Sequence, residues 1–273
     1  MKSFALALGG GGARGLAHVA VIEALDEMGQ KPVAIAGTSI GALIGAAYAA
    51  GMGGKDIRRY VIGIAHNRSD TVRRLMQARA GTLGQLFSGG LSQATQIDAE
   101  KFCAQFLPPA LPADFLALQI PLTVMATDFY RRQEAPLTSG PLGPALSAAI
   151  AVPGLFRPVA INGRILIDGG TTNPLPFDQL TGRADVVLAV DVLSGSPSER
   201  SDMPGLWEGV YAALNIMSSA IVAAKLDHRP PDIVIRPNVA IFRTLDFYQA
   251  SAILRSADAV KAEVKEKLGA LLA

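Results

Sequence analysis

The sequence predicts an α/β fold in which a mostly parallel sheet is covered by helices on both faces. The main observation is that short apolar runs alternate with helical patterns along almost the whole chain of 273 residues. A second is that runs such as Phe4–Leu8 and Asp185–Val192 are apolar almost without interruption, as in strands buried on both faces. The hydrophobic content of 50% is enough for a large core.

Composition excludes several classes of protein. A net charge of +2 is too small for a general nucleic-acid binder. Cys103 is the only cysteine, so no internal disulfide can form, and its helical surroundings predict a small core residue. The apolar run after Met1 is too short for a signal peptide, and no window of about 18 uninterrupted apolar residues predicts a membrane span. We therefore expect a cytoplasmic protein that could visit a membrane surface peripherally.

The first predicted strand, Phe4–Leu8, leads through a glycine-rich loop into a helical pattern over Leu16–Met28. The expected outer face of this helix carries three acidic side chains, Glu23, Asp26 and Glu27. Three glycines of the loop fit G-x-G-x-x-G and raise the hypothesis of a dinucleotide site, Gly10, Gly12 and Gly15. Such a site needs an acidic residue at the end of the second strand, where this chain has Gly37-Thr38-Ser39. Nucleotide binding is therefore the weaker hypothesis.

A glycine loop before a helix can also stabilise an anion, because free backbone N–H groups lie at the positive end of the helix dipole. A serine that attacks a carbonyl group creates an oxyanion, which needs about two such donors. We expect the donors among four backbone amides, those of Gly10, Gly11, Gly12 and Ile40. Arg14, at the start of the helix, could orient the loop or contact an anionic headgroup; a solvated surface cation is the simpler interpretation.

The second strand and helix surround a G-x-S-x-G motif. The apolar run Val33–Ala36 leads into Gly37-Thr38-Ser39-Ile40-Gly41, and an almost wholly apolar pattern follows over Ala42–Ala50. A strand, a sharp turn and a buried helix in this order form a nucleophile elbow, which exposes a serine hydroxyl at a strained corner. At Gly37 and Gly41 the strand and helix should approach so closely that a Cβ atom would clash. The alternative is a structural turn that happens to hold Ser39.

The segment 55–79 has a helical and basic pattern, in which seven Lys and Arg residues face only Asp56 and Asp70. Interleaved apolar residues make it amphipathic, so it could rest on anionic lipid or cover the site. An ordinary solvated helix face is the simpler interpretation. The four glycines of residues 81–93 predict a loop.

The rest of the chain continues the alternation of strands and helices. Strands are predicted over Ile120–Thr127, Glu134–Thr138, Phe156–Ile161, Arg164–Ile167, Asp185–Val192 and Ile233–Ile235. Helices are predicted over Asp98–Leu107, Pro144–Val152, Leu206–Leu226 and Asp246–Leu268, and residues 194–202 are polar. Asn162-Gly163 predicts a tight hairpin turn between two of the strands.

A serine hydroxyl is a poor nucleophile until a neighbouring base takes its proton. Histidine is the usual base, and this chain has three histidines. His18 lies in the first helix and His66 in the basic segment, whereas His228 alone follows an acid in the Ser, Asp, His order of the α/β-hydrolases.

Asp168 is the better candidate for the base. It closes the apolar strand that ends at Ile167, and Gly169 and Gly170 follow at once. Open α/β sheets place their chemistry at the carboxyl ends of strands, and an aspartate can act directly if it hydrogen-bonds the serine hydroxyl. The alternative is an Asp-Gly turn without chemistry.

Three blocks, Gly10–Gly15, Gly37–Gly41 and Asp168–Gly170, occur in the order and approximate spacing of the patatin-like phospholipases. The segments 147–156 and 173–176 also resemble that family, and the similarity to its bacterial members related to neuropathy target esterase spans about residues 4–192. The resemblance implies a three-layer α/β/α fold with Ser39 as nucleophile and Asp168 as proton acceptor. It places the oxyanion hole in the glycine loop. We expect supporting roles for Arg14, Gly15, Gly37, Gly41, Gly169 and Gly170.

The predicted function is that of a serine acyl-hydrolase, a phospholipase, lysophospholipase or esterase that cleaves fatty-acyl esters of lipids through a Ser-Asp dyad. We expect no cofactor and no metal, because no cluster of His, Cys and Asp has ligand spacing. Two alternatives stay open: an adaptor that keeps the site but binds a lipid or partner, and an acyltransferase whose acceptor is not water. We expect a single domain over 1–273, with the motifs in 4–192 and an extension over 193–273.

Overall fold

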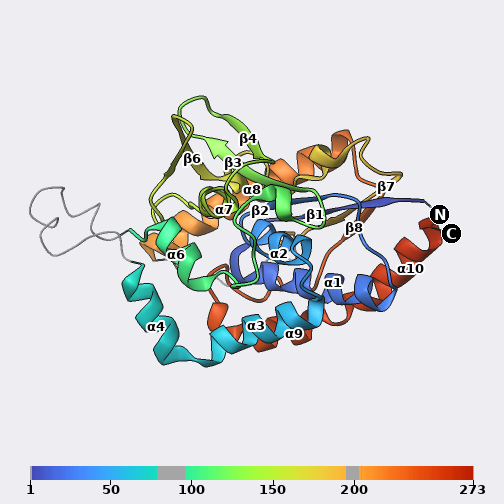
Figure 1. Cartoon of the computed structure of the whole chain (residues 1–273), viewed down its shortest axis with the longest axis horizontal. Coiled ribbons are helices and arrows are strands. Elements are labelled where there is room, and N and C mark those ends of the chain that lie inside the picture. Colours follow the sequence, from blue (N-terminus) through green and yellow to red (C-terminus); the bar gives the residue numbers. More distant parts are fainter. Residues whose placement is uncertain (1, 79–95, 195–202, 204, 273) are drawn as a thin grey trace, which may run out of the picture.

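The computed structural model describes residues 2–78, 96–194, 203 and 205–272. Its centre is a mixed, mostly parallel sheet flanked by helices, which confirms the predicted fold class (Figure 1). The strands are β1 (Phe4–Leu8), β2 (Ile35–Thr38), β3 (Leu122–Asp128), β4 (Gln133–Leu137), β5 (Val159–Ile161), β6 (Arg164–Asp168), β7 (Val186–Val190) and β8 (Ile233–Ile235). Their order across the sheet is β5-β6-β3-β2-β1-β7-β8, and β4 pairs with β3.

The parallel part of the sheet brings two chain turns to one edge. Strand β1 pairs in parallel with β2 and β7, so that Leu8 lies opposite both Gly37 and Val190. The glycine loop after β1 and the turn after β2 therefore leave the same edge of the sheet. Strand β3 continues the parallel part, and the sheet becomes antiparallel where β4 and β6 pair with β3.

The two faces of β1 bury side chains of different size. Phe4, Leu6 and Leu8 point into the larger core, which they share with α1 (His18–Glu27), α2 (Ile40–Ala49) and α10 (Val260–Leu272). Ala5 and Ala7 point into a smaller core on the opposite face, under the short helix Phe177–Leu180 and Val222 of α8 (Leu206–His228). The small side chains on this second face let its covering elements approach the sheet closely.

Two predicted helices are each divided. The basic segment forms α3 (Gly54–His66) and α4 (Arg68–Gln77), because Asn67 ends the first and caps the second by accepting a hydrogen bond from the Asp70 amide. The last predicted helix is a short turn, Phe247–Gln249, followed by α9 (Ala250–Ala257) and α10. Helices α6 (Ala99–Phe106) and α7 (Leu142–Ala149) occupy the places expected of them.

One side chain lies on the opposite side of its helix from the prediction. Glu23 was expected on the outer face of the first helix, but it is buried. Its carboxylate accepts hydrogen bonds from Arg58 of α3 and forms an ion pair with Lys261 of α10. Helix periodicity alone does not reveal such partners, which lie far away in the sequence.

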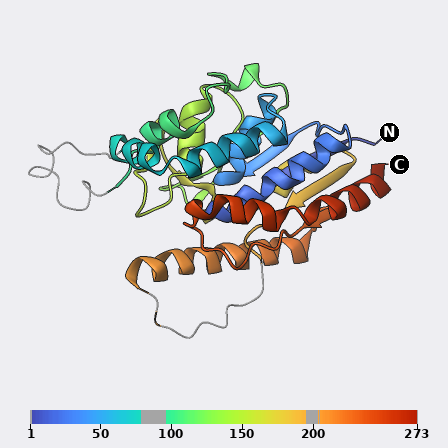
Figure 2. The same ribbon diagram turned by 90° about the horizontal axis from the view of Figure 1, so that it is seen from below.

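Helix α8 runs along one margin of the molecule (Figure 2). Within the described residues it is the one helix that, by length and composition, could cross a membrane, and 6% of its most apolar window is buried. This finding differs from the sequence expectation, because a criterion of uninterrupted apolar residues rejects a helix that carries Asn215, Ser218 and Ser219. The predicted loop over 81–93 and most of the polar stretch 194–202 lie outside the described residues.

Candidate active site

The G-x-S-x-G motif forms the turn between β2 and α2. Ser39 has a φ of 53° and a ψ of −125°, a combination that is unfavourable for a residue with a side chain. A Cβ atom at Gly41 would overlap the carbonyl oxygen of Leu8, and one at Gly37 would lie 2.6 Å from the carbonyl oxygen of Gly41. Glycine is therefore required at both positions, and the strained turn points the Ser39 hydroxyl away from the sheet edge.

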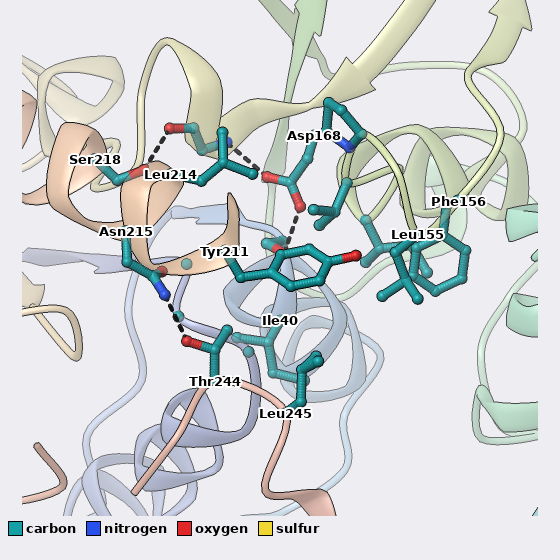
Figure 3. Close-up of a pocket in the computed structure, with 18 of the residues that line it drawn as sticks. Ile40, Leu155, Phe156, Asp168, Tyr211, Leu214, Asn215, Ser218, Thr244 and Leu245 are labelled. Carbon is teal, nitrogen blue, oxygen red and sulfur yellow. Dashed lines mark hydrogen bonds between the residues drawn. The ribbon is translucent and has the colours of Figure 1, made fainter. Parts of the chain in front are cut away.

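Asp168 is hydrogen-bonded directly to Ser39. The Ser39 hydroxyl donates a hydrogen bond to Oδ2 of Asp168 at 2.7 Å, and the Gly170 amide donates to Oδ1 at 2.7 Å (Figure 3). The Asp168 residue is 5% exposed. Burial raises the pKa of its carboxyl group to about 6, although the two hydrogen bonds partly oppose this rise. The carboxyl group is thus half protonated slightly below neutral pH and ionised above it.

Strand register explains how Asp168 reaches Ser39 across 129 positions of sequence. Thr38 lies opposite Met125 of β3, and the next residue of β3, Ala126, lies opposite Asp168 of β6. Asp168 is the last residue of β6, at the end of a strand as expected, and β6 runs antiparallel to β3. Strand β4 pairs with the other side of β3, so β2 and β6 pair with successive residues along the same side of β3, and Asp168 therefore lies next to the elbow.

The glycine loop supplies fewer free donors than expected. The Gly10 amide donates to the carbonyl oxygen of Pro174 at 2.9 Å, so the prediction that it serves the oxyanion hole is wrong for this geometry. The amides of Gly11, Gly12 and Ile40 donate to no acceptor in the part of the chain that the structure describes. These three residues line one cavity together with Ser39 and Asp168.

Backbone carbonyl groups of the segment after β8 hold the glycine loop in place through hydrogen bonds. The Ala13 amide donates to the carbonyl oxygen of Thr244 at 2.8 Å, and Arg14 Nε donates to that of Phe242 at 2.7 Å. Gly12 has a φ of 57°, and a Cβ atom there would overlap the Thr244 carbonyl oxygen. Arg14 does not line the cavity, which favours its expected role of orienting the loop over a contact with a headgroup.

The remaining supporting glycines permit close packing behind the site. A Cβ atom at Gly15 would overlap the side chain of Ile40, and one at Gly169 would lie 2.5 Å from the carbonyl oxygen of Met125. Larger residues there would displace the elbow or the strand that carries Asp168.

No described histidine lines the cavity. His66 and His228 are exposed on the surface. His18 is buried, and its Nε2 donates to the carbonyl oxygen of Gly9 at 2.8 Å. Burial lowers the pKa of His18 to about 4, so the ring is neutral at neutral pH. Its hydrogen bond to Gly9 fixes the residue at which the glycine loop begins. The sequence analysis placed His18 in the first helix but did not recognise this contact.

The cavity has a volume of about 530 Å³ and an apolar wall. Asp168 is the one charged side chain among its described lining residues. Two sets of lining residues were not foreseen: the inner side of α8 with Tyr211, Leu214 and Ile221, and the segment after β8 with Thr244 and Leu245 (Figure 3). The sequence signal for the first set is that α8 is apolar all round. Within the described residues, no group of His, Cys, Asp and Glu could hold a metal ion.

Comparisons with known proteins identify the family to which this chain is similar. A family model described as patatin-like phospholipase matches residues 6–181. An uncharacterized NTE family protein of Mycobacterium tuberculosis is 38% identical over 193 residues, which cover 70% of this chain and 49% of that protein. Lysophospholipase NTE1 of Yarrowia lipolytica is 30% identical over 290 residues, which cover 93% of this chain and 19% of that protein.

The structure of VipD from Legionella pneumophila superposes with a TM-score of 0.52 at 14% identity, covering 97% of this chain and 66% of that chain. This similarity concerns the fold alone. The matched region spans about half of the length of the mycobacterial relative and about a fifth of the fungal one.

Proposed function

The chain belongs to the patatin-like phospholipase family, and we propose that it acts as a serine acyl-hydrolase on fatty-acyl esters of lipids. The observation that carries this proposal is the 2.7 Å hydrogen bond from Ser39 to the buried carboxylate of Asp168, at the wall of an apolar cavity. In this proposal Ser39 is the nucleophile and Asp168 the general base.

In the first half of the reaction, Asp168 takes the proton of the Ser39 hydroxyl while Oγ attacks the carbonyl carbon of the ester. The carbonyl oxygen becomes an oxyanion that accepts hydrogen bonds from the amides of Gly11, Gly12 and Ile40. Loss of one such donor typically costs about 10²–10³ in kcat. The intermediate then expels the alcohol, which leaves with the proton from Asp168, and the acyl group stays on Ser39.

In the second half, the regenerated Asp168 carboxylate takes a proton from water, whose oxygen attacks the acyl-enzyme. The same amides bind the second oxyanion. Its collapse breaks the bond to Ser39 Oγ, which takes the proton back from Asp168, and the fatty acid is released. Because only the ionised carboxylate can act as the base, we expect kcat/KM to rise about tenfold per pH unit below pH 6 and to level off above it.

The family and the cavity both support a lipid ester as the proposed substrate class. The lysophospholipase relative supports a lipid ester as substrate, and the apolar wall suits an acyl chain. Of the basic segment, Ile64, Thr71 and Leu75 line the cavity. We therefore propose that the segment 55–79 covers the acyl chain. A contact with anionic lipid has less support, because Arg58 pairs with Glu23 and both Arg73 and Arg74 pair with Asp70.

The test compares hydrolysis of short- and long-chain p-nitrophenyl esters and of lysophospholipids by the wild type, Ser39→Ala, Asp168→Asn and His228→Ala. We expect the wild type and His228→Ala to be active, and the other two variants to lose at least about 10³-fold in kcat/KM. An inactive but folded His228→Ala would mean that a triad operates. A wild type that cleaves no ester would favour an adaptor, and acyl transfer to an added alcohol in place of water would identify an acyltransferase.

A further inference from the structure

The outer side of α8 is apolar and exposed to solvent. No residue from Gly209 to Ala224 is charged, and these 16 residues span about 24 Å of helix. Leu206 is 79% exposed and Ile216 is 69% exposed, and among the described side chains of this helix Val222 alone is buried. A helix that is apolar all round is ordinarily buried, either in a protein core or in a membrane. The described part of the protein covers one side of α8 only.

The substrate cavity opens beside this helix. Met217 of α8 lines the cavity and is about half exposed, and the same is true of Leu245 and Phe247 in the segment after β8. These three side chains form an apolar mouth. An acyl chain that enters between them would pass from the outer surface of α8 to Ser39 along apolar side chains.

The segment after β8 is tied to α8 and carries a further exposed apolar side chain. Asn215 of α8 donates a hydrogen bond to the Thr244 hydroxyl at 2.6 Å, which ties the segment to the helix (Figure 3). Ile241, three residues before Thr244, is 80% exposed. We define the α8 face as the exposed apolar side chains of Leu206, Val210, Ile216, Ile241 and the mouth residues.

We propose that the α8 face docks on the surface of a lipid bilayer, with α8 lying in the plane of the interface. The inference rests on the proposed function, because acyl lipids reside in aggregates and the cavity mouth must reach them. Helices that lie in an interface bury an exposed apolar side at the boundary of headgroups and acyl chains, and α8 has such a side while its opposite side packs on the protein. A second copy of the chain on this face would cover the mouth and block entry, so a lipid surface is the occupant that the geometry favours.

The chemistry of the face predicts how docking depends on salt and lipid charge. Since the stretch from Gly209 to Ala224 carries no charge, docking should be driven by apolar burial. It should therefore occur on uncharged phosphatidylcholine vesicles and persist in 0.5 M salt, a concentration that screens surface charges. Docking through the basic segment 55–79 would behave in the opposite way, needing anionic lipid and weakening in salt.

The experiment measures co-flotation of the full chain with phosphatidylcholine vesicles, in the Ser39→Ala background so that no lipid is consumed. The test variant is Ile216→Glu combined with Ile241→Glu; both side chains are exposed and neither lines the cavity. The matched control is Leu116→Glu, a 91% exposed apolar residue outside the α8 face. A second comparison uses Lys55→Glu with Arg59→Glu in the basic segment.

We expect the parent to float with vesicles at low and high salt, the double α8 variant to bind at least tenfold less, and the Leu116 and basic-segment variants to bind normally. With Ser39 restored, the α8 variant should cleave a water-soluble short-chain ester within twofold of the wild type but lose at least tenfold on substrate held in vesicles. Circular dichroism checks that the variant is folded.

Three results would overturn the proposal: no flotation of the parent, equal flotation of the α8 variant, or binding that needs anionic lipid and disappears in salt. A dimer in solution that the α8 substitutions convert to monomer would assign the face to a second copy. Failure of the proposed function is seen separately. Flotation needs no turnover, so vesicle binding without cleavage of any ester would contradict the proposed hydrolase function. Cleavage of soluble ester without vesicle binding would contradict only the proposed docking surface.

Discussion

Replacing Asp168 with asparagine should abolish hydrolysis and at the same time stabilise the fold. The carboxyl group is buried, which raises its pKa from an ordinary value of 3.8 to about 6 in the native protein. At pH 8 the native state must therefore hold a charge that its surroundings disfavour. A difference of about 2 between the native and unfolded pKa values corresponds to about 3 kcal/mol of lost stability.

The sign of the pH dependence follows from proton binding. Between about pH 4 and pH 6 the native protein keeps the Asp168 proton while the unfolded chain has released it, so the free energy of unfolding falls as pH rises through this window. Asparagine cannot ionise, so the variant lacks this fall. We expect Asp168→Asn to exceed the wild type by up to about 3 kcal/mol at pH 8 and to differ little from it near pH 4.

Urea denaturation followed by circular dichroism at pH 4, 5, 6 and 8 measures this difference. The control is Asp185→Asn, because the exposed Asp185 carboxylate accepts hydrogen bonds from Ser3, which hold its pKa below the ordinary value. That variant should gain no stability at pH 8. If Asp168→Asn gained none either, or if its gain did not grow with pH, then burial would not be the dominant influence on Asp168 and its assignment as a base tuned by burial would be wrong.

Other parts of the molecule give predictions of similar kind. Glu23→Gln should lower the free energy of unfolding by about 2 kcal/mol at pH 7 in urea denaturation, because it weakens a buried cluster with Arg58. Burial opposes ionisation of Glu23, but its cationic hydrogen-bond partners hold its pKa below the ordinary value. The loss of stability should therefore vanish in acid, where the wild-type carboxyl group is also neutral. Gly12→Ala should reduce kcat at least about 10²-fold by displacing the loop, whereas Gly29→Ala, at a similar φ with open space around it, should cost only about 1 kcal/mol of stability and no activity. Cys103 should resist iodoacetamide at pH 8 until urea unfolds the chain, since burial raises the pKa of its thiol to about 11; rapid alkylation of the native protein would contradict its place in the core.

The sequence predicted well those features that depend on neighbouring residues. Strand β1 has the expected bounds, and Asn162 and Gly163 both have the positive φ of the expected tight turn. The elbow at Ser39 was predictable because its sequence motif lies within five consecutive residues, 37–41. The covering of the sheet by helices on both faces was predictable, because strand segments that are apolar almost without interruption have to be buried on both faces.

Features that depend on distant partners were not predictable. The Gly10 amide is taken by Pro174, a residue 164 positions away, and no local pattern shows that pairing. The burial of Glu23 depends on cations from two other helices. Asp168 was identified as the residue that closes its strand, but its position beside the elbow depends on the pairing of β6 with β3, which the local sequence does not show. Helix α8 also lines the cavity. Its apolar pattern indicates burial but does not show which part of the chain it contacts.

The brace between the glycine loop and the segment after β8 has a consequence for how the chain can be divided. The family match ends at residue 181, yet the loop near its start is held by the backbone of Phe242 and Thr244. A fragment trimmed to the matched region would retain Ser39 and Asp168 and would lose the support opposite them. The region matched by the family model and the unit that holds the glycine loop thus have different boundaries, because residues beyond the match support the candidate site.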